Sequence, residues 1–108
     1  MVIAFDSLWL RAVCENREEA DAELGPAVAR VLRSRLADLD AANSATDLIA
    51  GSPRVITEGD FEYMAVNLQD GMRIEFMANY VKNPADGADH IVWANVSRIK
   101  IIGIRHGK

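Results

Sequence analysis

Hydrophobic residues follow two different periods along this chain, and the period changes near Pro53. Within residues 26–43, apolar side chains recur every three or four positions from Val28 to Leu39, which is the spacing of a helix with one buried face. Pro26 stands where the first helical turn accepts a proline. Beyond Pro53, β-branched and aromatic residues dominate, so the pattern predicts helices first and strands afterwards.

The first residues predict a short strand and a second helix. Residues 2–5 form an apolar run typical of a strand, and either Asp6 or Ser7 offers an N-cap for a helix that follows directly. Farther along, Ser44 or Thr46 offers a cap for one more helical turn before Gly51 and Pro53 break it. The helix that begins after Asp6 or Ser7 and the long helix over 26–43 are the two N-terminal helices that the pattern predicts.

Residues 61–68 and 72–77 predict a β-hairpin around Asp70-Gly71, because this dipeptide readily adopts the positive φ angles of a two-residue turn. A regular turn there pairs Leu68 with Arg73. One face then carries Met64, Val66, Leu68, Arg73, Glu75 and Met77. The other face carries Tyr63, Ala65, Ile74 and Phe76. Neither predicted face is purely apolar, so we expect helices on one side and a partly filled cleft on the other, with Arg73 as its unusual residue.

The order of these elements predicts an α+β fold. A polar loop over residues 79–90 leads into 91–108, which returns to strand composition and completes the sheet. With 108 residues, the chain has the length of a single domain, spanning 1–108. We therefore predict a small antiparallel sheet with two N-terminal helices packed on it.

Charge is unevenly distributed in a chain whose net charge is -4. Residues 91–108 contain no acidic residue, so residues 1–90 carry 8 basic against 16 acidic side chains. This uneven charge distribution favours a binding site for a polyanion. A basic edge strand that discourages aggregation is the alternative. The four basic residues of this last segment are Arg98, Lys100, Arg105 and Lys108.

Composition and motifs narrow the classes of protein further. The lone Cys14 excludes an intramolecular disulfide, and the N-terminus has no signal-peptide pattern, so we expect a cytoplasmic protein without a membrane segment. Phosphate-binding loops, nucleophile elbows and metal-ligand spacings are missing from the sequence, and we expect neither a cofactor nor a metal. His90 belongs to the polar loop over residues 79–90, so we expect it to be a surface residue.

His106 is the candidate for acid–base chemistry. Neighbouring cations favour the neutral imidazole, which is the form that accepts a proton. A histidine that only ends a strand is the alternative. A bulge at Gly103 would redirect every side chain after it, so the sequence leaves open which way His106 faces.

Four blocks carry a resemblance to a known family: "LRAVCE", "RLADLDAANSATDL", "VNLQDGMRIEF" and "WANVSRIKIIGIRH". In order and spacing they resemble the RelE/ParE superfamily of bacterial toxins, nearest its HigB-like branch, the plasmid maintenance system killers. The resemblance covers most of the chain. It implies a small sheet with two N-terminal helices and a toxin held inactive by an antitoxin encoded in an adjacent gene.

The resemblance also implies a target. RelE-like and HigB-like members cut messenger RNA on the ribosome, whereas ParE-like members poison DNA gyrase without hydrolysis. In the RNA-cutting branch Arg73 would bind the scissile phosphate, since a planar guanidinium suits that task. His106 would be the general acid or base. The ending Ile104-Arg105-His106 replaces the Asp-Tyr-His common in HigB-type toxins and looks closer to ParE-like chains.

The sequence thus leads to three functional hypotheses. The first is a ribosome-dependent, metal-independent mRNA endoribonuclease (an mRNA interferase) that uses His106, Arg73 and Arg105 as catalytic residues. The second is a ParE-like inhibitor of DNA gyrase, and the third is an inactive antitoxin-binding module. For the first, the residues predicted to contact RNA phosphates are Arg54, Arg98, Lys100 and Lys108.

Overall fold

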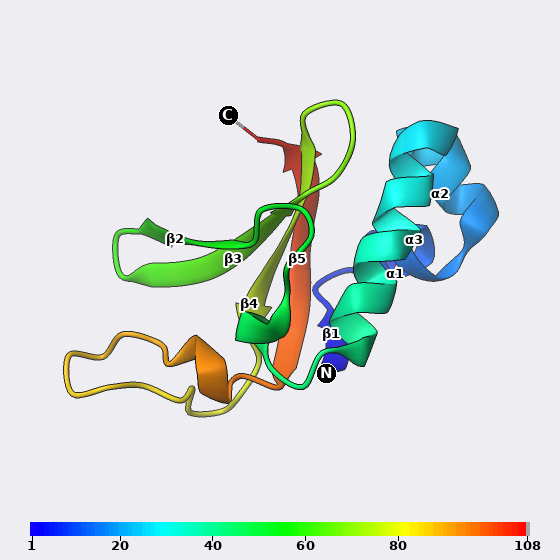
Figure 1. The fold of residues 1–108 in the computed structure, drawn as a ribbon. Coiled ribbons are helices and arrows are strands. Elements are labelled where there is room, and N and C mark those ends of the chain that lie inside the picture. Colours follow the sequence, from blue (N-terminus) through cyan, green and yellow to red (C-terminus); the bar gives the residue numbers. More distant parts are fainter. Residues whose placement is uncertain (108) are drawn as a thin grey trace.

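Helices α1 (Leu8–Glu15) and α3 (Pro26–Ala41) lie on one face of a five-stranded sheet, and α2 (Arg17–Leu24) packs on these two helices, in the computed structural model, which describes residues 1–107 (Figure 1). The predicted α+β class is confirmed. The elements in chain order are β1 (Val2–Phe5), α1 (Leu8–Glu15), α2 (Arg17–Leu24), α3 (Pro26–Ala41), β2 (Arg54–Glu58), β3 (Phe61–Asn67), β4 (Met72–Ala78) and β5 (Arg98–His106), with single 3-10 turns at Ala45–Asp47 and Trp93–Asn95.

The strands lie side by side in the order β1-β5-β4-β3-β2. Neighbouring strands are antiparallel except β1 and β5, which run parallel, with Val2 opposite Arg98 and Phe5 opposite Ile101. The prediction of a purely antiparallel sheet is therefore wrong at this one edge. Because β1 leads directly into α1, this edge also places the helices over one side of the sheet (Figure 1).

The helical layer contains α2 in addition to the two predicted helices. Its N-cap is Asn16, whose side-chain oxygen accepts the N–H groups of Glu18 and Glu19 at 3.0 and 3.2 Å. Only Ala20 of this helix is buried, so no apolar stripe announces it in the sequence. Of the described residues, none belongs to a helix long and apolar enough to cross a membrane.

The hydrophobic core lies between these helices and the sheet. Leu32 and Leu39 of α3 pack with Phe76, and Phe76 meets Trp93 edge to face at a ring-centroid distance of 6.4 Å. Ile99 and Ile101 of β5 are also fully buried there. Burial of this apolar area is the main stabilising contribution to the fold.

The predicted turn at Asp70-Gly71 is confirmed, but the pairing behind it differs from the prediction. The N–H of Met72 donates to the carbonyl of Gln69 at 3.1 Å, as in a two-residue turn. The N–H of Leu68 also donates to the carbonyl of Met72 at 2.8 Å. Leu68 and Gln69 therefore both lie opposite Met72 as a bulge, and Arg73 pairs with Asn67 instead of Leu68.

This shift of one residue reverses which side chains share a face. Met64 lies opposite Phe76 and Val66 opposite Ile74, so the helix-covered face of the hairpin is apolar. The prediction that neither face is purely apolar is therefore wrong for this face, whereas the opposite face does mix charged and apolar side chains. The physical reason is that burial against the helices selects the register with the larger apolar face, and the extra residue in the bulge makes that register possible.

A second irregularity lies in β5 next to Gly103, where a bulge was one of the alternatives that the sequence left open. Glu75 pairs with Gly103 but Phe76 pairs with Ile101, which leaves Ile102 as an additional residue. This bulge lets Ile101 and Ile104 both lie on the helix side of the sheet, and it turns Arg105 toward the opposite side.

Candidate functional site

The side of the sheet opposite the helices (Figure 1) is called the open face below. The strand register places most of the predicted site residues on it. The observed register and the alternation of side chains along a strand define its members. Five are basic and two acidic, a net charge of +3 on one face of a chain whose total is -4. The basic residues are Arg54, Arg73, Arg98, Lys100 and Arg105, and the acidic ones are Glu58 and Glu75.

A buried carboxylate lies at the centre of the open face. Arg73 donates from Nε to Oε2 of Glu75 at 2.7 Å, and Arg105 donates from Nε to both oxygens of Glu75 at 2.9 Å. The side chains of Arg73 and Glu75 are only 11% and 6% exposed, whereas that of Arg105 is 57% exposed. Arg73 is therefore mainly a partner of Glu75, and Arg105 is the arginine that reaches solvent.

The β5 bulge makes room for this carboxylate. It places Gly103 opposite Glu75, and a Cβ atom there would lie 3.2 Å from Oε1 of Glu75. A larger residue at this position would press on the ion pair. The glycine and the bulge together allow Arg73 and Arg105 to share one acceptor.

Tyr63 connects the arginines to the second acid. Its hydroxyl donates to Oε1 of Glu58 at 2.6 Å and lies 3.5 and 3.4 Å from Nη2 of Arg73 and Arg105. The hydrogen bond to Glu58, followed by burial, raises the pKa of Tyr63 above its ordinary value, so the hydroxyl stays protonated. The hydrogen bond and the charge of Glu75 raise the pKa of Arg105, which keeps it cationic.

The structure separates the three residues that were predicted to be catalytic. Arg73 and Arg105 pair across β4 and β5 on the open face. His106 pairs with Met72 and, as the next residue along the strand, has the opposite orientation to Arg105. His106 is exposed at the end of β5. Its catalytic role stays a prediction.

The residues predicted to contact phosphates differ in their surroundings. Arg54 donates from Nη1 to the carbonyl of Ser52 at 2.9 Å and borders a hollow of about 300 Å³ at the hairpin end. Lys100 lies 3.5 Å from Oδ1 of Asp6, and Arg98 is exposed at the start of β5. Lys108 lies outside the described residues. Arg54, Arg98 and Lys100 thus share the open face with Arg105.

Glu75 and Tyr63 are central to this network, but neither is among the site residues predicted from the sequence. A signal existed, because Arg73 and Glu75 stand at alternate positions within a strand of otherwise apolar residues. Two opposite charges with that spacing share a face and lie close enough to pair. Their partner Arg105 is 30 residues from Glu75 in the sequence and was not indicated by any local pattern.

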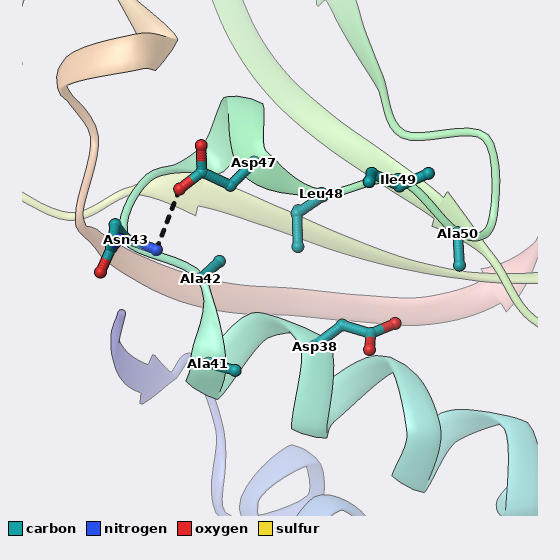
Figure 2. Close-up of a pocket in the computed structure, with 8 residues that line it drawn as sticks. All are labelled: Asp38, Ala41, Ala42, Asn43, Asp47, Leu48, Ile49 and Ala50. Atoms are coloured by element: carbon teal, nitrogen blue, oxygen red, sulfur yellow. Dashed lines mark hydrogen bonds between the residues drawn. The ribbon is translucent and has the colours of Figure 1, made fainter.

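Another hollow, of about 390 Å³, lies between the end of α3 and the 3-10 turn at Ala45–Asp47 (Figure 2). Its carboxylates already have partners within the chain. Asp47 accepts the N–H of Asn43 at 3.1 Å, drawn as a dashed line in Figure 2, and Asp38 pairs with Arg35 at 2.7 Å. Asp47 caps the 3-10 turn and Asp38 pairs with Arg35 within α3, so we assign this hollow a structural role.

Metal chemistry and known relatives give no further guidance. Within residues 1–107, the structure holds no group of three or more His, Cys, Asp or Glu side chains arranged to bind a metal ion. No protein-family model, no curated protein and no solved structure matches this chain. The function of the open face therefore has to be inferred from its own residues.

Proposed function

We propose that this protein is the toxin of a type II toxin-antitoxin pair and that it acts on messenger RNA at the ribosome, in the cytoplasm. One observation supports this proposal most directly: five basic side chains share the open face of an acidic protein. The resemblance to HigB-like toxins supports it independently. The open face is then the surface that contacts RNA.

The charge distribution suits a limited contact with RNA. The open face carries +3, which leaves -7 on the rest of the chain. Phosphates are attracted to the face and repelled elsewhere, so the protein engages RNA in one orientation and lacks broad affinity for nucleic acids. A strand held by the ribosome would be presented to this face without requiring high affinity for free RNA.

The proposed reaction is an intramolecular transesterification of the RNA backbone. The 2'-oxygen of one ribose attacks the adjacent phosphorus, and the bond from phosphorus to the 5'-oxygen breaks, giving a 2',3'-cyclic phosphate and a 5'-hydroxyl end. His106 would take the proton of the 2'-hydroxyl or supply one to the leaving oxygen. Arg105 would stabilise the negative charge that builds on the phosphate oxygens, because its guanidinium reaches solvent while Arg73 supports it through Glu75.

One specific observation favours a second candidate. His106 lies on the opposite side of β5 from Arg105, and Arg73 is occupied by Glu75. A surface without an assembled catalytic set suits a protein that binds its target and does not cleave it. A ParE-like inhibitor of DNA gyrase fits that description, as does an inactive module that binds only the antitoxin.

We propose that the partner in either case is an antitoxin encoded by an adjacent gene. Acidic residues of such a partner would neutralise the open face while bound. This arrangement explains why a surface with several cations is compatible with an otherwise acidic chain.

The test is to map RNA 5' ends across the transcriptome after brief induction of the chain without its partner. We expect new 5' ends at fixed positions within translated codons, and we expect them to disappear with His106→Ala and to decrease with Arg105→Ala. Arg30→Ala is the matched control, since Arg30 is an exposed arginine on the helical layer. Toxicity with DNA damage signalling and no new ends would favour the gyrase inhibitor, and a harmless wild type would favour the inactive module.

A further inference from the structure

A further hollow, of about 340 Å³, lies where β3 begins, next to the open face. Phe61 and Met77 give it apolar walls, and the loop after β4 contributes Lys82 and Asn83. Its volume is within the range of sites that bind small organic groups. The residues around it include no part of the Arg73–Glu75–Arg105 network, so the hollow is distinct from the predicted site.

Phe61 presents a fixed aromatic surface at this hollow. It is 43% exposed, and its ring stacks on Tyr63 with centroids 5.5 Å apart and planes 25° apart. Tyr63 is 2% exposed and held by the short hydrogen bond to Glu58. An exposed aromatic ring is a surface on which proteins stack the bases of single-stranded RNA, and Lys82 supplies a cation among the residues that line the hollow.

The polar groups at the hollow are mainly hydrogen-bond acceptors. Asp60 and Asp89 contribute carboxylates, and Oδ1 of Asn83 is buried without a hydrogen-bond partner among the described residues. Glu62 is already engaged, because its Oε2 lies 3.1 Å from Nδ1 of His90 and also accepts the N–H of Ile91. These acceptors repel a phosphate and favour a group that donates N–H bonds.

We propose that this hollow binds one base of single-stranded RNA, stacked on Phe61, and that it prefers a base with an exocyclic amino group. The amino group donates to Asn83 and to the carboxylates of Asp60 and Asp89, while the strand's phosphates follow the cations of the open face. This inference rests on the RNA-binding function proposed above and adds a specificity site to it.

The experiment measures fluorescence anisotropy of a labelled oligocytidylate of about eight nucleotides, a length within the range that single-stranded binding sites cover. An abasic oligonucleotide of the same length has the same charge and no bases. The variants are Phe61→Leu and, as matched control, Trp9→Leu, because Trp9 is a similarly exposed aromatic residue (45%) on the helical layer.

We expect the wild type and Trp9→Leu to bind oligocytidylate about tenfold more tightly than the abasic strand. Phe61→Leu should lose this difference while keeping its affinity for the abasic strand. Equal binding of oligocytidylate by the wild type and Phe61→Leu would overturn the inference and leave RNA binding by the open face intact. No binding of either strand by the wild type would also overturn it, and the map of 5' ends decides separately on the proposed function.

A second comparison tests the amino preference. Oligocytidylate and oligouridylate have pyrimidine rings of equal size but present an amino group and a carbonyl, respectively, at the same ring position. We expect the wild type to prefer oligocytidylate several-fold and Asn83→Ala to reduce that preference, with little change toward the abasic strand. Equal affinity of the wild type for the two oligonucleotides would overturn the assigned preference.

Discussion

The two faces of β4 have equally buried residues but are stabilised by different interactions. Ile74 and Phe76, on the helix side, are fully buried among apolar neighbours. Arg73 and Glu75, on the open face, are 9% and 4% exposed and are held by directional, charged hydrogen bonds. Consecutive residues of one strand therefore belong to two kinds of environment, and burial alone does not distinguish them.

The two faces differ in how the removal of one side chain lowers the stability of the fold. Apolar contacts are numerous and individually weak, so a truncated side chain leaves a cavity whose cost depends on how far the core relaxes. A charged network has few contacts, and the loss of one partner leaves another charge buried without compensation. The open face combines this sensitivity with exposed cations.

The largest effect is expected on the helix side. Phe76→Ala should lower the free energy of unfolding by about 4 kcal/mol, because it removes a fully buried ring that packs on Trp93. Urea unfolding followed by tryptophan fluorescence measures this. Phe76→Leu is the control and should cost clearly less. A loss below about 1 kcal/mol for the alanine variant would mean that the ring is not part of a close-packed core.

On the open face, Glu75→Ala should lower the free energy of unfolding by about 3 kcal/mol, because it leaves the buried guanidinium of Arg73 without its acceptor. Arg105→Ala should cost clearly less, since that side chain is largely solvated. Urea unfolding of both variants gives the comparison. Equal losses would contradict the difference in burial between the two arginines.

Tyr63→Phe should lower the free energy of unfolding by about 1 kcal/mol at neutral pH, because the hydroxyl loses its hydrogen bond to Glu58. The folded-state pKa of Tyr63 is raised above its ordinary 10.0, so its contribution is complete below pH 10.0 and declines as the pH rises through the folded-state pKa. The difference in stability between wild type and variant should therefore shrink above pH 10.0. Urea unfolding as a function of pH measures it. A constant difference would show that Glu58 does not hold the hydroxyl protonated.

The smallest effect is expected from deleting Gln69. Without it, Leu68 still lies opposite Met72 across the two-residue turn, so the faces of the hairpin keep their side chains. We expect a change in the free energy of unfolding below about 1 kcal/mol, since Gln69 is exposed. A large loss would show that the bulge itself is required for the twist of the hairpin, and equilibrium unfolding distinguishes the two cases.

Local patterns in the sequence were sufficient for most elements of this fold. The apolar spacing of residues 26–43 predicted α3, Ser7 was one of the two caps foreseen for α1, and Asp70-Gly71 predicted the turn between β3 and β4. Each of these signals acts within a few residues, through side-chain caps, backbone angles or one buried stripe. Helix α2 was missed because it buries only Ala20 and has no such stripe.

Only the tertiary structure decided which residues face one another. Alternation groups Arg73 with Glu75 within β4, but a single bulge residue determined whether Tyr63 or Met64 lies on the same face. A second bulge turned Arg105 toward Glu75 and His106 away from it. Bulges are selected by the burial of the apolar face against the helices, a free energy that involves distant parts of the chain. The sequence by itself thus determined the elements and their charges, and the packing of the core determined the site.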